Sequence, residues 1–212
     1  MRNEVKRINF LDFRNRFKGF ILISTFDIKK SFPNLHRRRL YEWVYRGLIK
    51  HVFRGFYIFS DLDIEEFSLF YIGNKIYEPS YISLQSAFSY YSLIPEYVSS
   101  ITCISSKKTT TLKTGMGTFL YFSIKPSLMF GYNIVQFGGH GFKMACPEKA
   151  LLDFLYINST LDSIEKFEEL RINTEIFNDI VDKEKLREYL CVFNNKALES
   201  RVKEFMRFIE NA

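Results

Sequence analysis

The segment from Ser24 to Phe59 constrains the fold most strongly, because it contains two short helical patterns followed by a hairpin pattern. Ser24 can cap a first helix, with Asp27 three residues further on as its partner in a capping box. Pro33 ends this helix, since proline cannot continue the helical hydrogen bonds.

A second helix is predicted directly after the first, over residues 35–46. Asn34 is a suitable N-cap for this helix, and Gly47 is a suitable residue just past its C-terminus. Two strands follow, over residues 48–53 and 56–59, joined by a turn at Arg54-Gly55. Two short helices followed by a tight hairpin are the layout of a winged helix-turn-helix.

The predicted second helix has one apolar face and one basic end. Leu40, Trp43, Val44 and Leu48 recur at three- and four-residue spacing, which is typical of a face packed against a core. The four consecutive basic residues from His36 to Arg39 fall in the first turn, where positive charge opposes the helix macrodipole. In helix-turn-helix proteins this turn contacts base edges, and arginine matches the two acceptors of guanine.

We therefore expect the N-terminal region to bind DNA through side chains of both helices and the hairpin. Contacts from the preceding helix and the hairpin would go to phosphates, which set affinity and salt dependence. The candidate DNA-binding residues are Lys29, Lys30, Asn34, His36, Arg37, Arg38, Arg39, Lys50, His51 and Arg54. The alternative interpretation is a solvated basic surface on an ordinary small helical domain.

The charge distribution favours a polyanionic partner at the N-terminal end. Residues 1–60 contain 14 Lys and Arg against 4 Asp and Glu, a net charge of +10. The other 152 residues contain 16 basic and 20 acidic residues, a net charge of −4. A basic region of this kind suits DNA, and it also suits RNA or a membrane surface.

The whole pattern predicts an α+β fold with two domains, because a chain of 212 residues is long enough for two small cores. Residues 1–60 form the predicted winged helix-turn-helix, and residues 61–212 form a mixed α/β domain with a small sheet and C-terminal helices. Helices are predicted over residues 3–18, 83–91 (with Ser83 as cap), 147–156, 182–191 and 195–210, with a helix or linker over 61–72. Strands are predicted over residues 20–23, 97–105, 119–124, 132–137 and 142–144.

The apolar segments and the cysteines bear on the cellular compartment. No stretch approaches the roughly 18 consecutive apolar residues that cross a bilayer, which favours a cytoplasmic protein with no membrane partner. Cys103, Cys146 and Cys191 are widely spaced in apolar surroundings. They are predicted to be buried free thiols rather than a disulfide.

The sequence offers weak candidates for catalysis. Glu148 and Asp153 are five residues apart, about 140° around a helix, and are poorly placed as a paired metal site. The Gly-Gly-His-Gly turn at residues 138–141 lacks the context of a phosphate-binding loop, and the cysteines lack metal-ligand spacing. We therefore expect no catalytic residues, no metal and no cofactor.

Three motifs, taken in order, resemble the AbiEi family of antitoxins, which are also described as predicted transcriptional regulators of viral defence systems. The motifs are Arg54-Gly55-Phe56-Tyr57 in the hairpin, Tyr81-Ile82-Ser83 with Ser86-Ala87, and Ala145 to Asp153. The resemblance covers residues 20–156. It marks Tyr81, Ser83, Ser86, Pro147, Glu148, Lys149 and Asp153 as the motif residues of the antitoxin domain. The chain departs from the family at Tyr91-Ser92, where a His-Gly pair is frequent, and the resemblance does not extend to residues 157–212.

The resemblance implies a DNA-binding antitoxin of a type IV toxin–antitoxin system, acting in phage defence. Its winged helix would bind the operon's own promoter as a repressor. Its C-terminal domain would counteract a nucleotidyltransferase-like toxin without forming a stable complex. An orphan winged-helix regulator, a nucleic-acid-processing enzyme with a winged-helix targeting module and a protein-interaction module are the alternatives. The operator and the oligomeric state stay open, with a homodimer among the alternatives.

Overall fold

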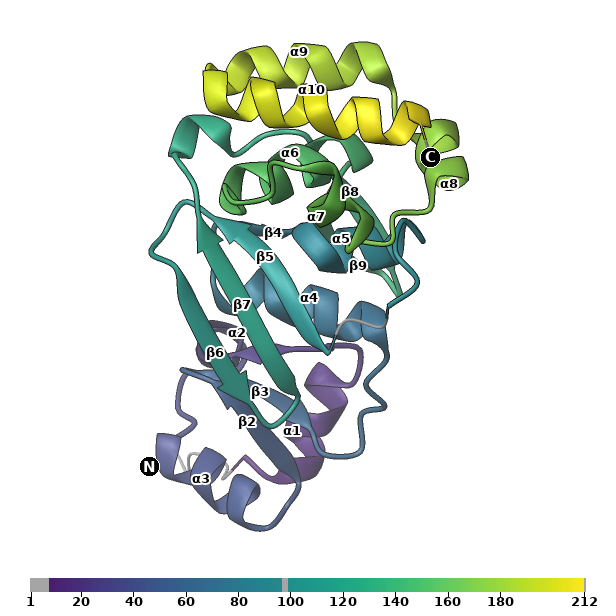
Figure 1. Cartoon of the computed structure of the whole chain (residues 1–212). Coiled ribbons are helices and arrows are strands. Elements are labelled where there is room, and N and C mark those ends of the chain that lie inside the picture. Colours follow the sequence, from purple (N-terminus) through teal and green to yellow (C-terminus); the bar gives the residue numbers. More distant parts are fainter. Residues whose placement is uncertain (1–7, 97–98, 212) are drawn as a thin grey trace, which may run out of the picture. The chain divides into compact units, whose positions relative to one another are not determined.

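The computed structural model describes residues 8–96 and 99–211, which form helices and strands in both halves of the chain (Figure 1). This content confirms the predicted α+β class. The chain divides into two compact units. The N-terminal unit comprises Met1–Ser68 with Thr114–Met116, and the C-terminal unit comprises Leu69–Lys113 with Gly117–Ala212. The sequence placed the boundary after residue 60.

The N-terminal unit combines three helices with a three-stranded antiparallel sheet in its described residues. The elements are α1 (Phe10–Phe17), β1 (Ile23–Ser24), α2 (Thr25–Ser31), α3 (Arg37–Tyr45), β2 (Ile49–Phe53) and β3 (Phe56–Phe59). In the sheet, β3 lies between the other two strands, with Ile23 opposite Tyr57 and Ile49 opposite Phe59. The predicted order of two short helices followed by a hairpin is therefore present.

The first helix is shorter than the predicted helix over residues 3–18. Asn9 is its N-cap, and the Asn9 side chain accepts a hydrogen bond from the Asp12 backbone N–H at 2.8 Å. Residues 3–7 lie outside the described residues. The strand predicted over residues 20–23 is also shorter, because Ile23 alone of these residues pairs with β3.

The start of α3 corrects the prediction that Asn34 caps a helix over residues 35–46. The Leu35 backbone N–H instead donates to the Phe32 carbonyl at 3.0 Å in a turn, and His36 becomes the N-cap without a side-chain capping bond. Residues 32–35 therefore form a turn before the helix, and Leu35 packs against the core of the unit.

The end of α3 confirms the predicted role of Gly47. This glycine has a φ of +67°, and its N–H donates to the Val44 carbonyl at 3.0 Å. The Leu48 N–H donates to the Trp43 carbonyl at 2.9 Å. Together these bonds form a Schellman motif, which turns the chain sharply into β2.

The core of the N-terminal unit is largely aromatic. Trp43 lies 4.8 Å from Phe13 and 5.5 Å from Phe10, measured between ring centres. Phe13 also lies 6.0 Å from Phe59 of the sheet. These contacts join α1, α3 and β3 in one cluster, and they leave the opposite side of α3 uncovered within this unit.

The C-terminal unit is built on a six-stranded sheet in the order β6-β7-β5-β4-β9-β8. Its strands are β4 (Ser80–Ile82), β5 (Ser100–Ser105), β6 (Thr110–Thr114), β7 (Gly117–Ser123), β8 (Tyr132–Phe137) and β9 (His140–Ala145). Its helices are α4 (Glu66–Ile76), α5 (Leu84–Tyr90), a 3₁₀ turn (Pro126–Leu128), α6 (Pro147–Ile157), α7 (Ile164–Glu168), α8 (Thr174–Ile180), α9 (Lys183–Phe193) and α10 (Lys196–Asn211). The sheet is mixed, because β4 pairs parallel to β9 and antiparallel to β5.

Helices lie on both faces of this sheet. On one face the Tyr121 hydroxyl donates to the Gly73 carbonyl of α4 at 2.6 Å, and Phe70 of α4 lies 5.7 Å from Phe142 of β9. Tyr81 points to the other face, because its neighbour Ile82 aligns with Cys103, which shares the Tyr121 face. On that second face α6 packs on the sheet, and α9 and α10 pack on α6 (Figure 1).

Most of the predicted elements of this unit are present, with changes at their ends. The helices predicted over residues 147–156, 182–191 and 195–210 are α6, α9 and α10. The part of the predicted strand at residues 97–98 lies outside the described residues. Four helices and strands, β4, β6, α7 and α8, have no predicted counterpart, and neither does the 3₁₀ turn. No helix in the described residues is long and apolar enough to cross a membrane.

The cysteines agree with the prediction at two of three positions. Cys103 and Cys146 are buried free thiols, whereas Cys191 is free but exposed. Cys191 lies on the outer side of α9 beside Val192, which is also exposed. The prediction that Cys191 is buried was therefore wrong. Its neighbours in the sequence are apolar, but the buried side of α9 is formed by Leu186 and Phe193.

We predict that Gly55→Ala destabilises the N-terminal unit by about 1–2 kcal/mol, because alanine is strained at positive φ. Gly55 has a φ of +85°, and a β-carbon there would lie 2.9 Å from the Thr25 hydroxyl oxygen. Urea unfolding followed by tryptophan fluorescence measures this, since Trp43 is the single tryptophan of the sequence and is buried in this unit.

Gly19→Ala is the matched control, because a β-carbon at residue 19 would have open space. Equal unfolding midpoints for the two variants would contradict the assigned strain at Gly55.

Candidate nucleic-acid interface

The exposed side of α3 is set by the way in which the helix is anchored. Leu40 and Trp43 are buried, and Val44 is half-buried against the same core. Arg38 lies on the other side of the helix and Arg37 at the edge of the buried face, and both are exposed. The predicted separation into a core face and a basic face is therefore present.

The three arginines of the first turn have different surroundings. The Arg38 side chain is 89% exposed and lies 3.5 Å from the Glu42 carboxylate. The Arg37 guanidinium lies over the Tyr41 ring, 5.8 Å from its centre. Both guanidinium groups stand at the surface of the N-terminal unit.

Arg39 is held within the unit. It donates to the Glu42 carboxylate at 2.7 Å and to the Ile8 carbonyl at 3.5 Å, and its guanidinium lies 5.5 Å from the Trp43 ring centre. Its side chain is 24% exposed, against 89% for Arg38. Unlike Arg37 and Arg38, Arg39 therefore contributes to the packing of α3 within the unit.

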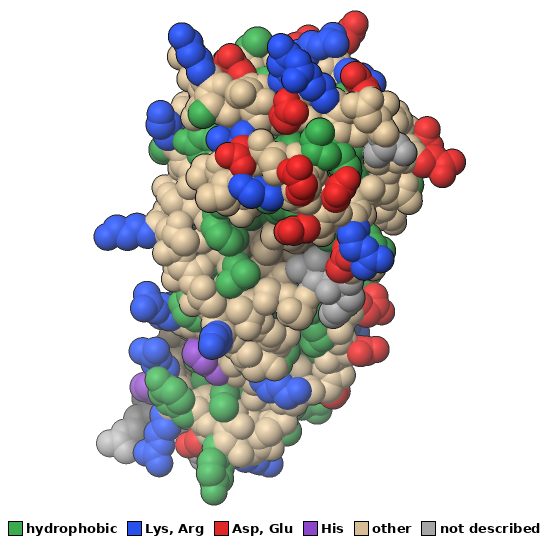
Figure 2. All heavy atoms as spheres, viewed as in Figure 1, with side chains coloured by type: hydrophobic (Ala, Val, Ile, Leu, Met, Phe, Trp, Pro, Cys, Tyr) green, Lys and Arg blue, Asp and Glu red, His purple; other side chains and the backbone are tan. Residues whose placement is uncertain are grey.

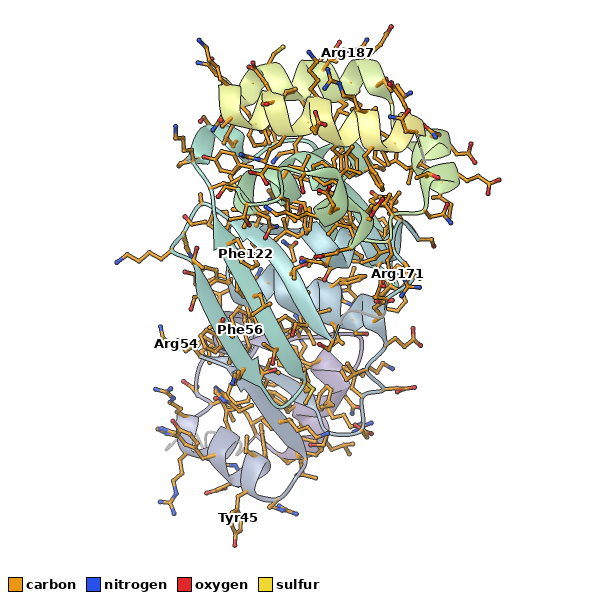
Figure 3. The ribbon with its side chains drawn as sticks, viewed as in Figure 1. Tyr45, Arg54, Phe56, Phe122, Arg171 and Arg187 are labelled. Atoms are coloured by element: carbon orange, nitrogen blue, oxygen red, sulfur yellow. The ribbon has the colours of Figure 1, made fainter. Side chains whose placement is uncertain are left out.

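The hairpin of β2 and β3 is fixed to the start of α2. The Thr25 backbone N–H donates to the Gly55 carbonyl at 2.8 Å, and a capping box between Ser24 and Asp27 begins α2 at the same point. Arg54, at the hairpin turn, points outward (Figure 3). The position of the hairpin turn relative to α2 therefore does not depend on a ligand.

A groove of about 830 Å³ runs between α2, α3 and the hairpin. Its floor is apolar and its edges carry positive charge. The floor is formed by Ile28, Leu35, Leu40, Val44 and Tyr57, and the exposed edges include Lys29, Arg37, Tyr41, His51 and Arg54. Figure 2 shows Lys, Arg and His side chains gathered on this face of the N-terminal unit.

The phenol of Tyr57 is a hydrogen-bonding group on the floor of this groove. Burial raises the pKa of Tyr57, and the nearby Tyr41 adds to the rise while Arg37 opposes it. The hydroxyl is therefore protonated at neutral pH. The His51 ring lies 5.4 Å from the Tyr57 ring. Arginine, histidine and phenol donors thus surround one groove, which suits an anionic ligand.

Four of the ten predicted DNA-binding residues line this groove, namely Lys29, Arg37, His51 and Arg54. Lys29, Lys30, His36, Lys50, His51 and Arg54 are exposed, as is Asn34 despite its failure as a cap. The sequence interpretation missed Tyr41 and Tyr45, which are 57% and 93% exposed on α3. Arg37, Tyr41 and Tyr45 are separated by four residues each. This spacing puts them along one side of a helix, which could have identified the tyrosines as part of the exposed surface.

The motif residues of the C-terminal unit form a buried network rather than an open site. Tyr81 and Ser83 donate to one oxygen of Asp153, at 2.8 and 2.9 Å. Lys149 donates to the other oxygen of Asp153 and, at 2.8 Å, to the Tyr81 hydroxyl. The Lys149 and Asp153 side chains are fully buried. The predicted capping bond of Ser83 is absent because its hydroxyl is used here.

Burial dominates the ionisation of this pair. It raises the pKa of Asp153 and lowers the pKa of Lys149, and the attraction between the two charges opposes both shifts. Burial together with the adjacent Asp153 also raises the pKa of Tyr81, so the phenol remains a donor. The cation is further surrounded by the rings of Phe130 and Phe193, at 5.1 and 4.9 Å from their centres.

The other motif residues connect this network to its neighbours. Ser86 and Thr102 exchange two hydrogen bonds, at 2.8 and 2.9 Å, which join α5 to β5. Pro147 occupies the first turn of α6. Glu148 accepts from the Asp182 backbone N–H and pairs with Lys185 of α9, each at 3.0 Å. The motif therefore joins β4, α5, α6 and α9 rather than lining a surface.

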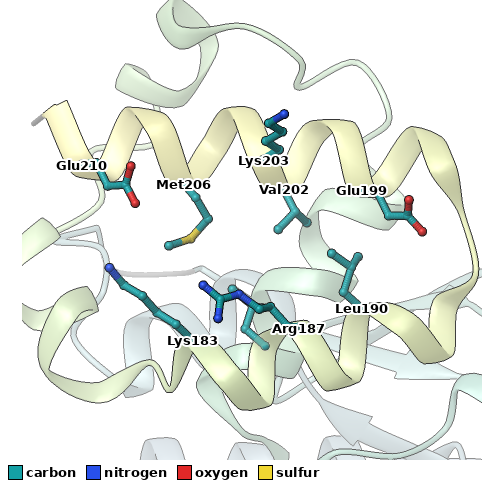
Figure 4. A pocket seen from close by; sticks show the side chains of 9 residues that line it. Lys183, Arg187, Leu190, Glu199, Val202, Lys203, Met206 and Glu210 are labelled. Atoms are coloured by element: carbon teal, nitrogen blue, oxygen red, sulfur yellow. The ribbon is translucent and has the colours of Figure 1, made fainter.

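A second hollow lies between α9 and α10 in the C-terminal unit (Figure 4). It has a volume of about 260 Å³, and its lining mixes apolar side chains with charges of both signs. The lining residues are Lys183, Leu186, Arg187, Leu190, Glu199, Val202, Lys203, Met206 and Glu210. This mixture indicates no single ligand chemistry.

The comparisons with known proteins assign the chain to no group. No protein-family model matches the sequence, and no curated protein matches it. Within residues 8–96 and 99–211, no cluster of three or more His, Cys, Asp or Glu side chains could hold a metal ion.

We predict that Lys149→Met destabilises the protein by about 3–5 kcal/mol, because it leaves a buried carboxylate without its cation. The double variant Lys149→Met/Asp153→Leu should be more stable than the single variant, since it removes both charges. Urea unfolding followed by far-ultraviolet circular dichroism compares the two.

Lys166→Met is the matched control, because Lys166 pairs with Asp162 at the same four-residue spacing but at the surface. The control should change the unfolding midpoint little. If Lys149→Met lowers the free energy of unfolding no more than the control does, the buried Lys149–Asp153 pair is not important for stability.

Proposed function

We propose that the N-terminal unit is a winged helix-turn-helix that binds double-stranded DNA. In this proposal α2 and α3 form the helix-turn-helix, α3 enters the major groove and the β2–β3 hairpin is the wing. The order of three helices and a three-stranded antiparallel sheet supports the assignment. In the chain the β2–β3 hairpin directly follows α3, as the proposed arrangement requires.

The observation that carries the proposal is the exposure of Arg37 and Arg38 at the start of α3. Leu40 and Trp43 anchor the helix by burial, and Arg39 packs against Trp43. The guanidinium groups of Arg37 and Arg38 stand at the surface. Cations in the first turn of a helix oppose its macrodipole. A duplex phosphate backbone and guanine edges would reverse this cost.

The wider charge pattern supports the same partner. Lys29 of α2, His51 of β2 and Arg54 at the turn lie along the groove beside Arg37. These groups would contact phosphates on either side of the major groove. Residues 1–60 carry a net charge of +10, so the affinity should depend strongly on salt.

We further propose that the chain is an AbiEi-type antitoxin that represses its own operon in the cytoplasm. The support is the resemblance of the three motifs, two of which fall in the C-terminal unit. There the motif residues form one connected polar network, as residues that maintain a shared fold would. The C-terminal unit would counteract a nucleotidyltransferase-like toxin without a stable complex, and the chain itself would not be an enzyme.

We predict that Arg37→Ala and Arg38→Ala each weaken binding to the duplex upstream of the protein's own gene. A lost base contact costs about 1–3 kcal/mol, and a lost phosphate contact lowers the salt dependence of binding. Mobility-shift titrations at several salt concentrations measure both quantities. Arg187→Ala, an exposed arginine of α9 in the other unit, is the control and should bind like the parent.

Equal affinity and salt dependence of the double variant Arg37→Ala/Arg38→Ala and the parent would rule out α3 as the reading helix. Circular dichroism of each variant shows whether its fold is retained.

If the chain is an AbiEi-type antitoxin, a toxic, nucleotidyltransferase-like protein should be encoded beside its gene. We predict that co-expression of the chain restores growth of cells that produce this neighbouring protein. Arg37→Ala/Arg38→Ala should still restore growth, because those residues lie in the other unit from the proposed antitoxin domain. Growth rate at equal levels of the two proteins is the measurement. If the parent chain leaves the toxicity unchanged, the antitoxin proposal fails and an orphan DNA-binding regulator is favoured.

A further inference from the structure

Tyr41 and Tyr45 are exposed aromatic residues on the helix that carries Arg37 and Arg38. They are 57% and 93% exposed, respectively. Figure 3 shows Tyr45 pointing away from α3. In the described part of the chain, the Tyr45 side chain makes no hydrogen bond, ion pair or ring contact. Exposed aromatic side chains beside exposed guanidinium groups indicate a binding surface rather than a role in the core.

The two tyrosines extend the surface that the arginines begin. Tyr45 follows Arg38 by seven residues, which is just under two helical turns, so both lie on nearly the same side of α3. Their α-carbons are separated by about 10.5 Å along the helix axis at 1.5 Å per residue. Tyr41 follows Arg37 by one turn, and the Arg37 guanidinium lies over its ring. Arg37, Arg38, Tyr41 and Tyr45 thus form an exposed stripe along α3, which begins with guanidinium groups and ends with phenol rings.

We propose that Tyr41 and Tyr45 select base pairs containing thymine in the major groove, next to the base pairs read by the arginines. This inference rests on the proposed function, in which α3 enters the groove. Thymine carries a 5-methyl group that cytosine lacks, and an apolar side chain can contact that methyl group. The phenol rings supply the apolar surface, and their hydroxyl groups can bond to a base or a phosphate.

The distance between Arg38 and Tyr45 along α3 sets the expected spacing between the base pairs that they contact. A separation of about 10.5 Å along a helix in the groove spans at most about three base pairs, because each pair rises about 3.4 Å along the duplex axis. The base pair selected by Tyr45 should therefore lie within about three positions of the one contacted by Arg38. Tyr41 should act on the base pairs between them.

The experiment selects duplexes from a random library with the full-length chain and sequences the bound DNA. Tyr45→Ala should lose a thymine preference at one or two adjacent positions while keeping the preference attributed to Arg38. On the duplex that the parent selects, replacing that thymine by uracil removes only the methyl group. This should weaken the parent about tenfold and leave Tyr45→Ala nearly unchanged.

Two variants control for the fold and for general loss of apolar surface. Tyr45→Phe keeps the ring and should still distinguish thymine from uracil. Ile134→Ala removes a side chain that is 63% exposed in the C-terminal unit, and it should leave the base preferences of the parent intact.

The outcomes separate this inference from the proposed function. If the parent binds duplexes in a salt-sensitive way but Tyr41→Ala and Tyr45→Ala keep its base preferences, the inference is wrong and the DNA-binding proposal stands. If the parent binds no duplex at low salt, both are wrong. Loss of the thymine preference together with loss of the uracil effect supports the inference.

Discussion

The packing of α3 through one side determines most of what the N-terminal unit presents to solvent. Trp43 is buried 4.8 Å from the Phe13 ring, and Leu40 is buried on the same side of the helix. Fully burying a large apolar side chain stabilises a protein by about 1.5–3 kcal/mol. A basic residue in the first helical turn costs roughly 0.3–1 kcal/mol. The apolar contacts therefore fix the rotation of α3, and Arg37 and Arg38 face outward as a consequence.

The C-terminal unit places charge in its interior, which a protein tolerates only when the charges are paired and hydrogen-bonded. Lys149 and Asp153 meet this condition because Tyr81 and Ser83 complete the bonding of the carboxylate. These residues, which belong to the motifs that resemble the AbiEi family, therefore hold β4 and the residue after it to α6. Contact with a toxin would have to come from side chains at the surface of this unit, because these four are buried.

Local signals were sufficient to predict the order of elements in the N-terminal unit. The capping box at Ser24 and the glycine at residue 47 depend on neighbours within a few positions, and both are present. The predicted start of α3 was wrong by two residues, because the Leu35 N–H donates to the Phe32 carbonyl in a turn that precedes the helix. In the C-terminal unit the burial of Lys149 was not predictable from local signals, because its partner Tyr81 lies 68 positions away in the sequence.

The three consecutive arginines show why a candidate site cannot be read from residue type alone. In the sequence Arg38 and Arg39 are equivalent neighbours, but each residue of a helix is rotated by about 100° from the last. That rotation turns Arg39 toward Trp43 and Glu42, where it supports the fold. The same rotation places Tyr45 nearly in line with Arg38. The angle of a side chain around α3, measured from the buried face, therefore separates the residues that hold the helix from those that can contact a ligand.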